Sequence, residues 1–84
     1  MYRDEIINKI LKVIQNEVFF GKMPPLDFNE PLGEEGVGID SLNFLKLLTV
    51  LEKEFNMKIE DDYWDYNSLK TVNLITDYFH NMEN

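Results

Sequence analysis

Apolar residues recur at helical spacing in three stretches of the chain, and each stretch predicts an amphipathic helix. The first runs from about residue 4 to 19, the second from about 41 to 56, and the last from Asn67 or Ser68 to about Asn81. Residues three and four positions apart share one side of an α-helix, so this spacing gives each helix an apolar face. Asn67 or Ser68 is expected to cap the last helix. Its expected apolar face comprises Leu69, Val72, Leu74, Ile75, Tyr78 and Phe79.

The second predicted helix carries two groups of residues that point in different directions. At about 100° per residue, one narrow sector holds five large apolar residues, which we assign to the core: Phe44, Leu47, Leu48, Leu51 and Phe55. A second stripe, well over a right angle away, comprises Leu42, Leu45, Lys46, Thr49 and Lys53. Leu42 is therefore expected to face a partner. Leu45 fits a wide core and a partner-facing surface equally well.

The stretch between the first two helices differs in composition from the rest of the chain. All four glycines and all three prolines lie between Phe20 and Asp40. No long helix can run through such a stretch, because proline and glycine interrupt it. Apolar residues are nevertheless spaced along it: Met23, Leu26, Phe28, Leu32, Val37 and Ile39. We expect an ordered loop that packs on the helices, with at most a short helical turn.

Residues 60–66 combine acidic and aromatic side chains, just after Ile59, which should anchor the turn. A calcium-binding EF-hand loop needs glycine at its sixth position and glutamate at its twelfth, and this stretch has neither in place. We therefore expect no metal site but a short helix, with Trp64 and one tyrosine facing inward. The predicted fold class is all-α: a small four-helix bundle of three longer helices and one short helix, with a long loop between helices 1 and 2.

Composition narrows the function further. The chain has 84 residues, 16 acidic against 8 basic residues, a net charge of −8 and no cysteine. This length predicts one domain spanning residues 1–84. A polyanion repels nucleic acid, and its natural partners present basic surfaces. With no apolar run long enough for a membrane span and no signal peptide, we expect a free-standing, monomeric, cytoplasmic protein without membrane insertion.

The candidate chemistry centres on Ser41, which follows a glycine-containing turn and opens the second helix. Its hydroxyl could cap the helix, as could the carboxylate of Asp40, or it could be presented to a partner. The free amides and positive dipole end of the first turn would suit a phosphodiester on Ser41. A serine hydrolase would need a base, and the sole histidine, His80, is near the chain's end. We expect no catalytic residues and no metal site.

The segment Gly38-Ile39-Asp40-Ser41-Leu42 resembles the attachment signature of the acyl carrier and peptidyl carrier protein family. The resemblance continues through the aliphatic second helix, which ends Leu51-Glu52-Lys53-Glu54-Phe55, to Ile59 and to the last helix with its Tyr78-Phe79 ending. It covers essentially the whole chain.

This resemblance implies that Ser41 receives 4′-phosphopantetheine from coenzyme A through a phosphopantetheinyl transferase, with Asp40 in support. The thiol of this arm would carry acyl or aminoacyl groups as thioesters, which agrees with the lack of cysteines. Further implied partners are an acyl- or aminoacyl-loading enzyme and condensing or transferring enzymes of fatty-acid, polyketide or nonribosomal-peptide biosynthesis. The residues expected to govern docking are Leu42, Asn43, Leu45, Lys46 and Thr49.

Two departures from the fatty-acid-synthesis pattern favour a specialised pathway. Asn43 and Lys46 stand where carriers of that class usually have acidic residues, and extra length between Ile59 and Val72 holds the cluster Tyr63-Trp64-Asp65-Tyr66. The alternative hypothesis is an acidic, carrier-like helical module that acts only in protein–protein interaction, without a prosthetic group.

Overall fold

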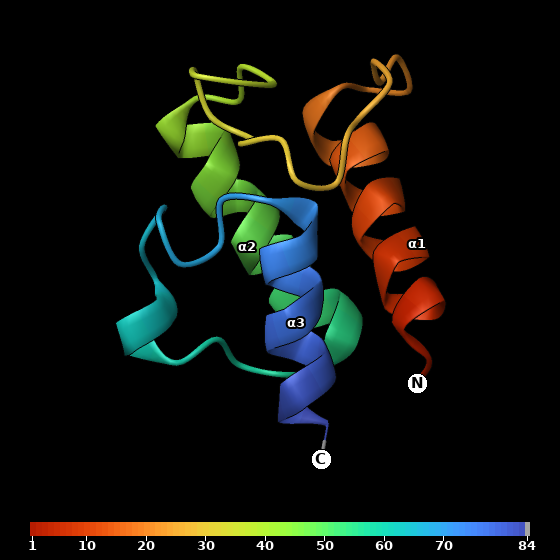
Figure 1. The fold of residues 1–84 in the computed structure, drawn as a ribbon, viewed down its shortest axis with the longest axis vertical. Coiled ribbons are helices and arrows are strands. Elements are labelled where there is room, and N and C mark those ends of the chain that lie inside the picture. Colours follow the sequence, from red (N-terminus) through yellow and green to blue (C-terminus); the bar gives the residue numbers. More distant parts are fainter. Residues whose placement is uncertain (84) are drawn as a thin grey trace.

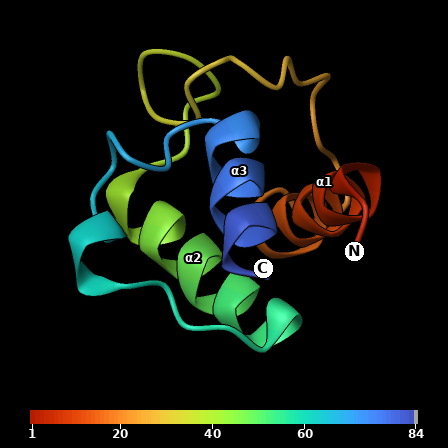
Figure 2. The ribbon, with the colours of Figure 1, turned by 60° about the horizontal axis from the view of Figure 1, so that its bottom comes forward.

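A computed structural model describes residues 1–83 of the chain, and over these residues the fold is all-helical without strands (Figure 1). The three helices are α1 (Arg3–Val13), α2 (Ser41–Phe55) and α3 (Val72–Met82). A π-helical turn, η1 (Ile14–Val18), extends α1, and a 3₁₀ turn, η2 (Asp61–Tyr63), lies between α2 and α3. Helix α1 packs against both α3 and α2 (Figures 1 and 2).

The first helix has the extent that its apolar pattern predicts, but its last turn is wider. The Glu5 side chain accepts a hydrogen bond from the backbone amide of Tyr2, which secures the first turn. Ile6, Ile10 and Val13 face the core. Beyond Val13 the backbone bonds skip one more residue, as in the bond from the Phe19 amide to the Ile14 carbonyl. Spacing along the sequence cannot separate this π-helical turn from an α-helical one.

The core face predicted for the second helix is confirmed. Its five predicted core residues are all buried: Phe44, Leu47, Leu48, Leu51 and Phe55. Phe55 stacks on Phe79 of α3 with ring centroids 4.5 Å apart. Asn56, in the left-handed conformation that ends many helices, terminates α2. The prediction that Leu42 points away from the core is also confirmed, because its side chain is 81% exposed.

The predicted start and apolar face of the last helix need correction. Thr71 caps α3 by accepting a hydrogen bond from the Leu74 amide, whereas Ser68 bonds Asp65 within the preceding turn. Leu74 is exposed, so its assignment to the apolar face is wrong. Thr76 is buried in the core instead, and its hydroxyl donates to the Val72 carbonyl. A threonine can enter the core here because the helix supplies the partner for its hydroxyl.

The four-helix bundle is confirmed only in part, because the expected short helix is a single 3₁₀ turn, η2. Three residues give one turn, which is too short to pack as a helix. As predicted, Trp64 packs against the core together with Tyr66, while Tyr63 stays largely exposed. The fold is therefore three helices with a turn-rich segment between α2 and α3.

The loop between η1 and α2 is ordered as predicted, through backbone bonds to the segment before α3 and to α3 itself. The Leu32 amide donates to the Lys70 carbonyl at 2.7 Å, and the Asn73 amide donates to the Phe28 carbonyl at 3.0 Å. Leu32 is fully buried, and the Ile39 amide bonds the Leu32 carbonyl, which brings the loop back to α2. The loop contains turns but no helix.

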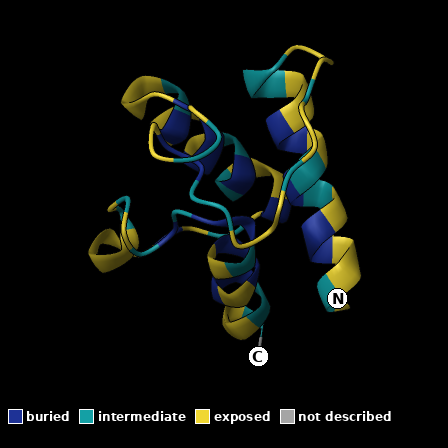
Figure 3. Ribbon diagram, turned by 45° about the horizontal axis from the view of Figure 1, so that its top comes forward, coloured by how far each residue is buried: buried dark blue, intermediate teal, exposed yellow. Residues whose placement is uncertain are grey.

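One hydrophobic core holds the structure together (Figure 3). It is formed by the buried apolar residues of the three helices together with four residues from the connecting segments: Leu32, Ile39, Ile59 and Leu69.

Within residues 1–83, no helix is long and apolar enough to cross a membrane.

A matched pair of leucine substitutions in α2 tests the assignment of its two faces. Leu51→Ala should lower the free energy of unfolding by about 2–5 kcal/mol, because it opens a cavity in the core. Leu42→Ala should change it by about 0.5 kcal/mol or less, because that side chain is exposed. Urea unfolding measures both; equal losses would contradict the assignment.

Candidate functional site

Ser41 is the first residue of α2, and the backbone before it turns sharply to expose its side chain. Gly38 has φ +98°, in the left-handed region that favours glycine. Ile39 follows with its side chain buried in the core. The turn at Gly38 and the anchor at Ile39 together fix where α2 begins.

Asp40, rather than Ser41, caps the helix. The Asp40 carboxylate accepts a hydrogen bond from the Asn43 amide at 2.9 Å, and the Asp40 carbonyl accepts one from the Phe44 amide at 2.8 Å. Within residues 1–83 the Ser41 hydroxyl forms no hydrogen bond. The two roles that the sequence leaves open are thus divided between neighbours: Asp40 holds the helix end, and Ser41 is left exposed.

The first turn of α2 fits a phosphodiester on Ser41. In the described part of the chain, the amides of Ser41 and Leu42 have no acceptor, since Asp40 occupies only those of Asn43 and Phe44. Unpaired amides and the positive end of the helix dipole stabilise an anion at this position. No carboxylate occupies the first turn of α2 itself.

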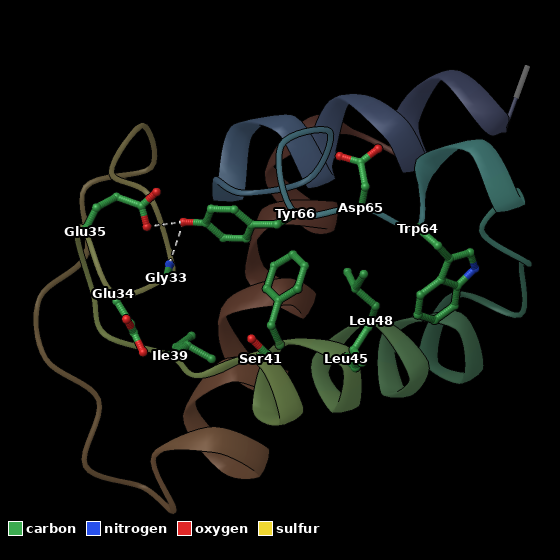
Figure 4. A pocket seen from close by; sticks show the side chains of 11 residues that line it. Gly33, Glu34, Glu35, Ile39, Ser41, Leu45, Leu48, Trp64, Asp65 and Tyr66 are labelled. Atoms are coloured by element: carbon green, nitrogen blue, oxygen red, sulfur yellow. Dashed lines mark hydrogen bonds between the residues drawn. The ribbon is translucent and has the colours of Figure 1, made fainter.

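A cavity of about 400 Å³ opens beside Ser41, between the start of α2, the loop and the segment before α3 (Figure 4). Its inner wall is apolar, with Ile39, Phe44 and Leu48, and its outer wall is formed by Trp64 and Tyr66. Further lining residues are Gly33, Glu34, Glu35, Leu45 and Asp65.

Tyr66 braces the wall of this cavity. Its hydroxyl accepts a hydrogen bond from the Gly33 amide at 2.8 Å and donates one to Glu35 Oε1 at 2.6 Å (Figure 4). Its ring meets Phe44 edge to face, with centroids 5.3 Å apart. Burial raises the pKa of Tyr66, and the hydrogen bond to Glu35 raises it further, by a smaller amount. The same hydrogen bond lowers the pKa of Glu35. The sequence indicates an inward tyrosine but not its partners, which lie more than thirty residues away.

The predicted docking residues do not share one environment. Leu42 and Lys46 are exposed, and Leu45 is 48% exposed although it also lines the cavity. Asn43 is partly buried. The Thr49 hydroxyl is exposed but donates to the Leu45 carbonyl. Four of these five residues therefore lie on the surface of α2.

The structure adds contacts around Lys46 that the sequence analysis missed. Lys46 Nζ lies 3.2 Å from the Glu17 carbonyl oxygen and 5.8 Å from the ring centre of Phe20. Glu17 lies in η1, and Phe20 lies in the turn that follows it. Only tertiary packing brings them to α2, so no local pattern could have indicated them.

His80 lies in the last turn of α3 and is not among the residues that line the Ser41 cavity. Over residues 1–83, no group of three or more His, Cys, Asp or Glu side chains is placed to hold a metal ion.

Comparison with known protein families decides the class. A family model described as the phosphopantetheine attachment site matches residues 5–79, which is most of the chain. The chain belongs to the phosphopantetheine-binding carrier family. Domains of this family are the sites of covalent 4′-phosphopantetheine attachment, and they act as acyl carriers rather than as catalysts. They interact with modifying enzymes and with partner enzymes.

The cap of this carrier domain can be tested at two neighbouring residues. Asp40→Ala should lower the free energy of unfolding by about 1 kcal/mol, because the Asn43 amide loses its acceptor. Asp40→Asn should retain most of the stability. Ser41→Ala should stay within about 0.5 kcal/mol of wild type. Chemical unfolding compares the three; an equal loss in Ser41→Ala would show that Ser41 also caps.

The Tyr66 brace of the carrier should give a pH-dependent signal. Tyr66→Phe leaves the Gly33 amide without its acceptor, which should cost about 1 kcal/mol at neutral pH. The pKa of Glu35 is lowered below its ordinary 4.5, so its bond stabilises the fold above that value and is lost as pH falls. The difference between wild type and Tyr66→Phe should therefore narrow on acidification from about pH 6 to about pH 3. Chemical unfolding curves measure the free energy of unfolding of both proteins across this pH range. A difference that stays constant with pH would contradict a stabilising role for the bond to Glu35.

Proposed function

We propose that Ser41 carries the 4′-phosphopantetheine arm and that the protein delivers acyl or aminoacyl thioesters to partner enzymes. One observation carries the assignment to Ser41. The chain has five serine and threonine residues. The hydroxyls of Thr49, Ser68 and Thr76 donate hydrogen bonds within the protein, and that of Thr71 accepts one as the cap of α3. Among the serine and threonine residues, all of which lie within residues 1–83, Ser41 alone has an exposed hydroxyl that forms no hydrogen bond.

The surroundings of Ser41 support this role. When the arm is bound, its thiol supplies the sulfur for thioester formation, which the cysteine-free chain lacks. Attachment forms a phosphodiester bond at Ser41 Oγ while the pyrophosphate bond of coenzyme A breaks. Adenosine 3′,5′-bisphosphate is the leaving group, and the hydroxyl proton passes to a base of the transferase. The open amides of Ser41 and Leu42 favour the resulting negative charge. Asp40 supports the attachment point indirectly, by capping the helix that presents it.

The docking role of the outer stripe of α2 is part of the same proposal. The side of α2 that begins at Ser41 exposes Leu42, Leu45, Lys46 and Thr49, with the half-buried Asn43 beside them. An enzyme that acts on the arm near its attachment point meets these residues first. A tethered cargo reaches such an enzyme at high effective concentration, so docking itself can be weak and quickly reversed.

The pathway is a further part of the proposal, and the same surface supports it. Asn43 and Lys46 leave the start of α2 without the carboxylates that a general fatty-acid partner would recognise, so we propose a specialised polyketide, nonribosomal-peptide or aminoacyl-transfer pathway. Residues 1–84 would act there as a single carrier domain.

Mass spectrometry tests the attachment. Incubation with coenzyme A, magnesium and a promiscuous phosphopantetheinyl transferase should raise the intact mass by one phosphopantetheine. Ser41→Ala should show no increase, while Ser68→Ala, the matched control, should be modified like wild type.

Two outcomes would contradict the proposal. An increase that persists in Ser41→Ala would place the arm elsewhere. No increase in folded wild-type protein would favour the alternative, an interaction module without the prosthetic group.

A further inference from the structure

Phe20 is the most unusual residue outside the attachment site. Its side chain is 80% exposed, and its backbone has φ +51°, the left-handed conformation that side chains other than asparagine and aspartate rarely adopt. An aromatic residue here stabilises the fold little through burial and strains the backbone. Glycine would adopt this conformation without that strain. Burial in the core therefore does not explain a phenylalanine at this position.

The contacts of Phe20 tie it to the helix that presents Ser41. Lys46 Nζ lies 5.8 Å from the centre of the Phe20 ring, within the range of a cation–π contact. The same ammonium group bonds the Glu17 carbonyl and lies 3.8 Å from the Glu17 carboxylate. Lys46 is one helical turn from Leu42, on the same side of α2. Phe20, in the turn that follows η1, thus places an exposed aromatic ring beside the side of α2 that carries Leu42 and Lys46.

This surface is nearly neutral although the chain is strongly acidic. We define the Phe20–Leu42 surface as Phe20, Leu42, Leu45 and Lys46. Residues 41–51 of α2 contain no carboxylate, and their one cation, Lys46, is paired with Glu17. The net charge of −8 therefore belongs to other parts of the molecule. An enzyme that approaches this surface gains more from apolar contact than from charge attraction.

We propose that Phe20 extends the docking surface of α2 and gives the phosphopantetheinyl transferase an apolar contact beside Leu42 and Leu45. This inference rests on the proposed attachment at Ser41. A transferase must bring coenzyme A to Ser41 Oγ, so it necessarily covers the adjacent Leu42. Leu42 and Leu45 are exposed apolar residues of α2, and Phe20 lies beside Lys46 on the same helix. Burying apolar surface favours association, and aromatic residues are enriched in the buried centre of interfaces.

Steady-state modification kinetics with a purified promiscuous transferase test the role of Phe20. Phe20→Ala should lower kcat/KM for the carrier about tenfold through KM, with kcat nearly unchanged, because docking and not the chemical step is weakened. Phe28→Ala is the matched control, since Phe28 is a partly exposed phenylalanine whose backbone binds α3 rather than α2. It should leave kcat/KM within about twofold of wild type.

Thermal unfolding separates docking from folding. Phe20→Gly relieves the positive φ, so its melting temperature should be no lower than that of wild type, although its KM rises as in Phe20→Ala. A functional loss without a stability loss cannot come from misfolding.

Salt dependence tests the apolar character of the contact. Raising sodium chloride from about 0.05 M to about 0.5 M should change kcat/KM of wild type less than about threefold, because screening acts on charges and not on apolar contact. A fall of tenfold or more would mean that a basic face docks instead.

These experiments separate a failure of attachment at Ser41 from a failure of docking at Phe20. No modification of wild type would refute attachment at this domain. Normal modification with equal KM for wild type, Phe20→Ala and Phe20→Gly would leave attachment intact and overturn the docking proposal.

Discussion

Burial of one face of α2 is the constraint on which the rest of the structure depends. Three leucines of this face, Leu47, Leu48 and Leu51, are completely buried, and Phe55 stacks on α3 at the far end. Because the core side of α2 is fixed, its opposite side must be exposed, and Ser41 and Leu42 emerge at its start. Packing of α2 in the core therefore holds the start of the helix, and with it Ser41, in a fixed position.

The beginning of α2 is set as firmly as its orientation. Gly38 makes the left-handed turn, Ile39 enters the core and Asp40 caps the first turn. These neighbouring residues divide three tasks, so the hydroxyl of Ser41 has no structural duty. A carrier needs this division, because a serine that capped its own helix would lose part of that stabilisation when it became a phosphodiester.

The sequence predicts most of what depends on local periodicity. The core face of α2 and the exposure of Leu42 follow from spacing along one helix, and both are confirmed. Features that depend on distant residues were not predicted. Ser68 and Thr71 both have side chains that can cap a helix, but Thr71 caps α3. The backbone bond from Leu32 to Lys70, just before Thr71, comes from tertiary packing that no local sequence pattern contains. In the same way, tertiary packing alone places Phe20 beside Lys46 and joins Tyr66 to Glu35.

Family membership establishes a phosphopantetheine carrier, and the geometry singles out the residue that we propose to bear the arm. The most direct measurement is localisation of the added group by proteolysis and fragmentation mass spectrometry of the transferase-treated protein. We predict that the phosphopantetheine lies on the peptide that contains Ser41, at Ser41 itself. Its presence on a peptide that contains Thr49, Ser68, Thr71 or Thr76 but not Ser41 would contradict the account.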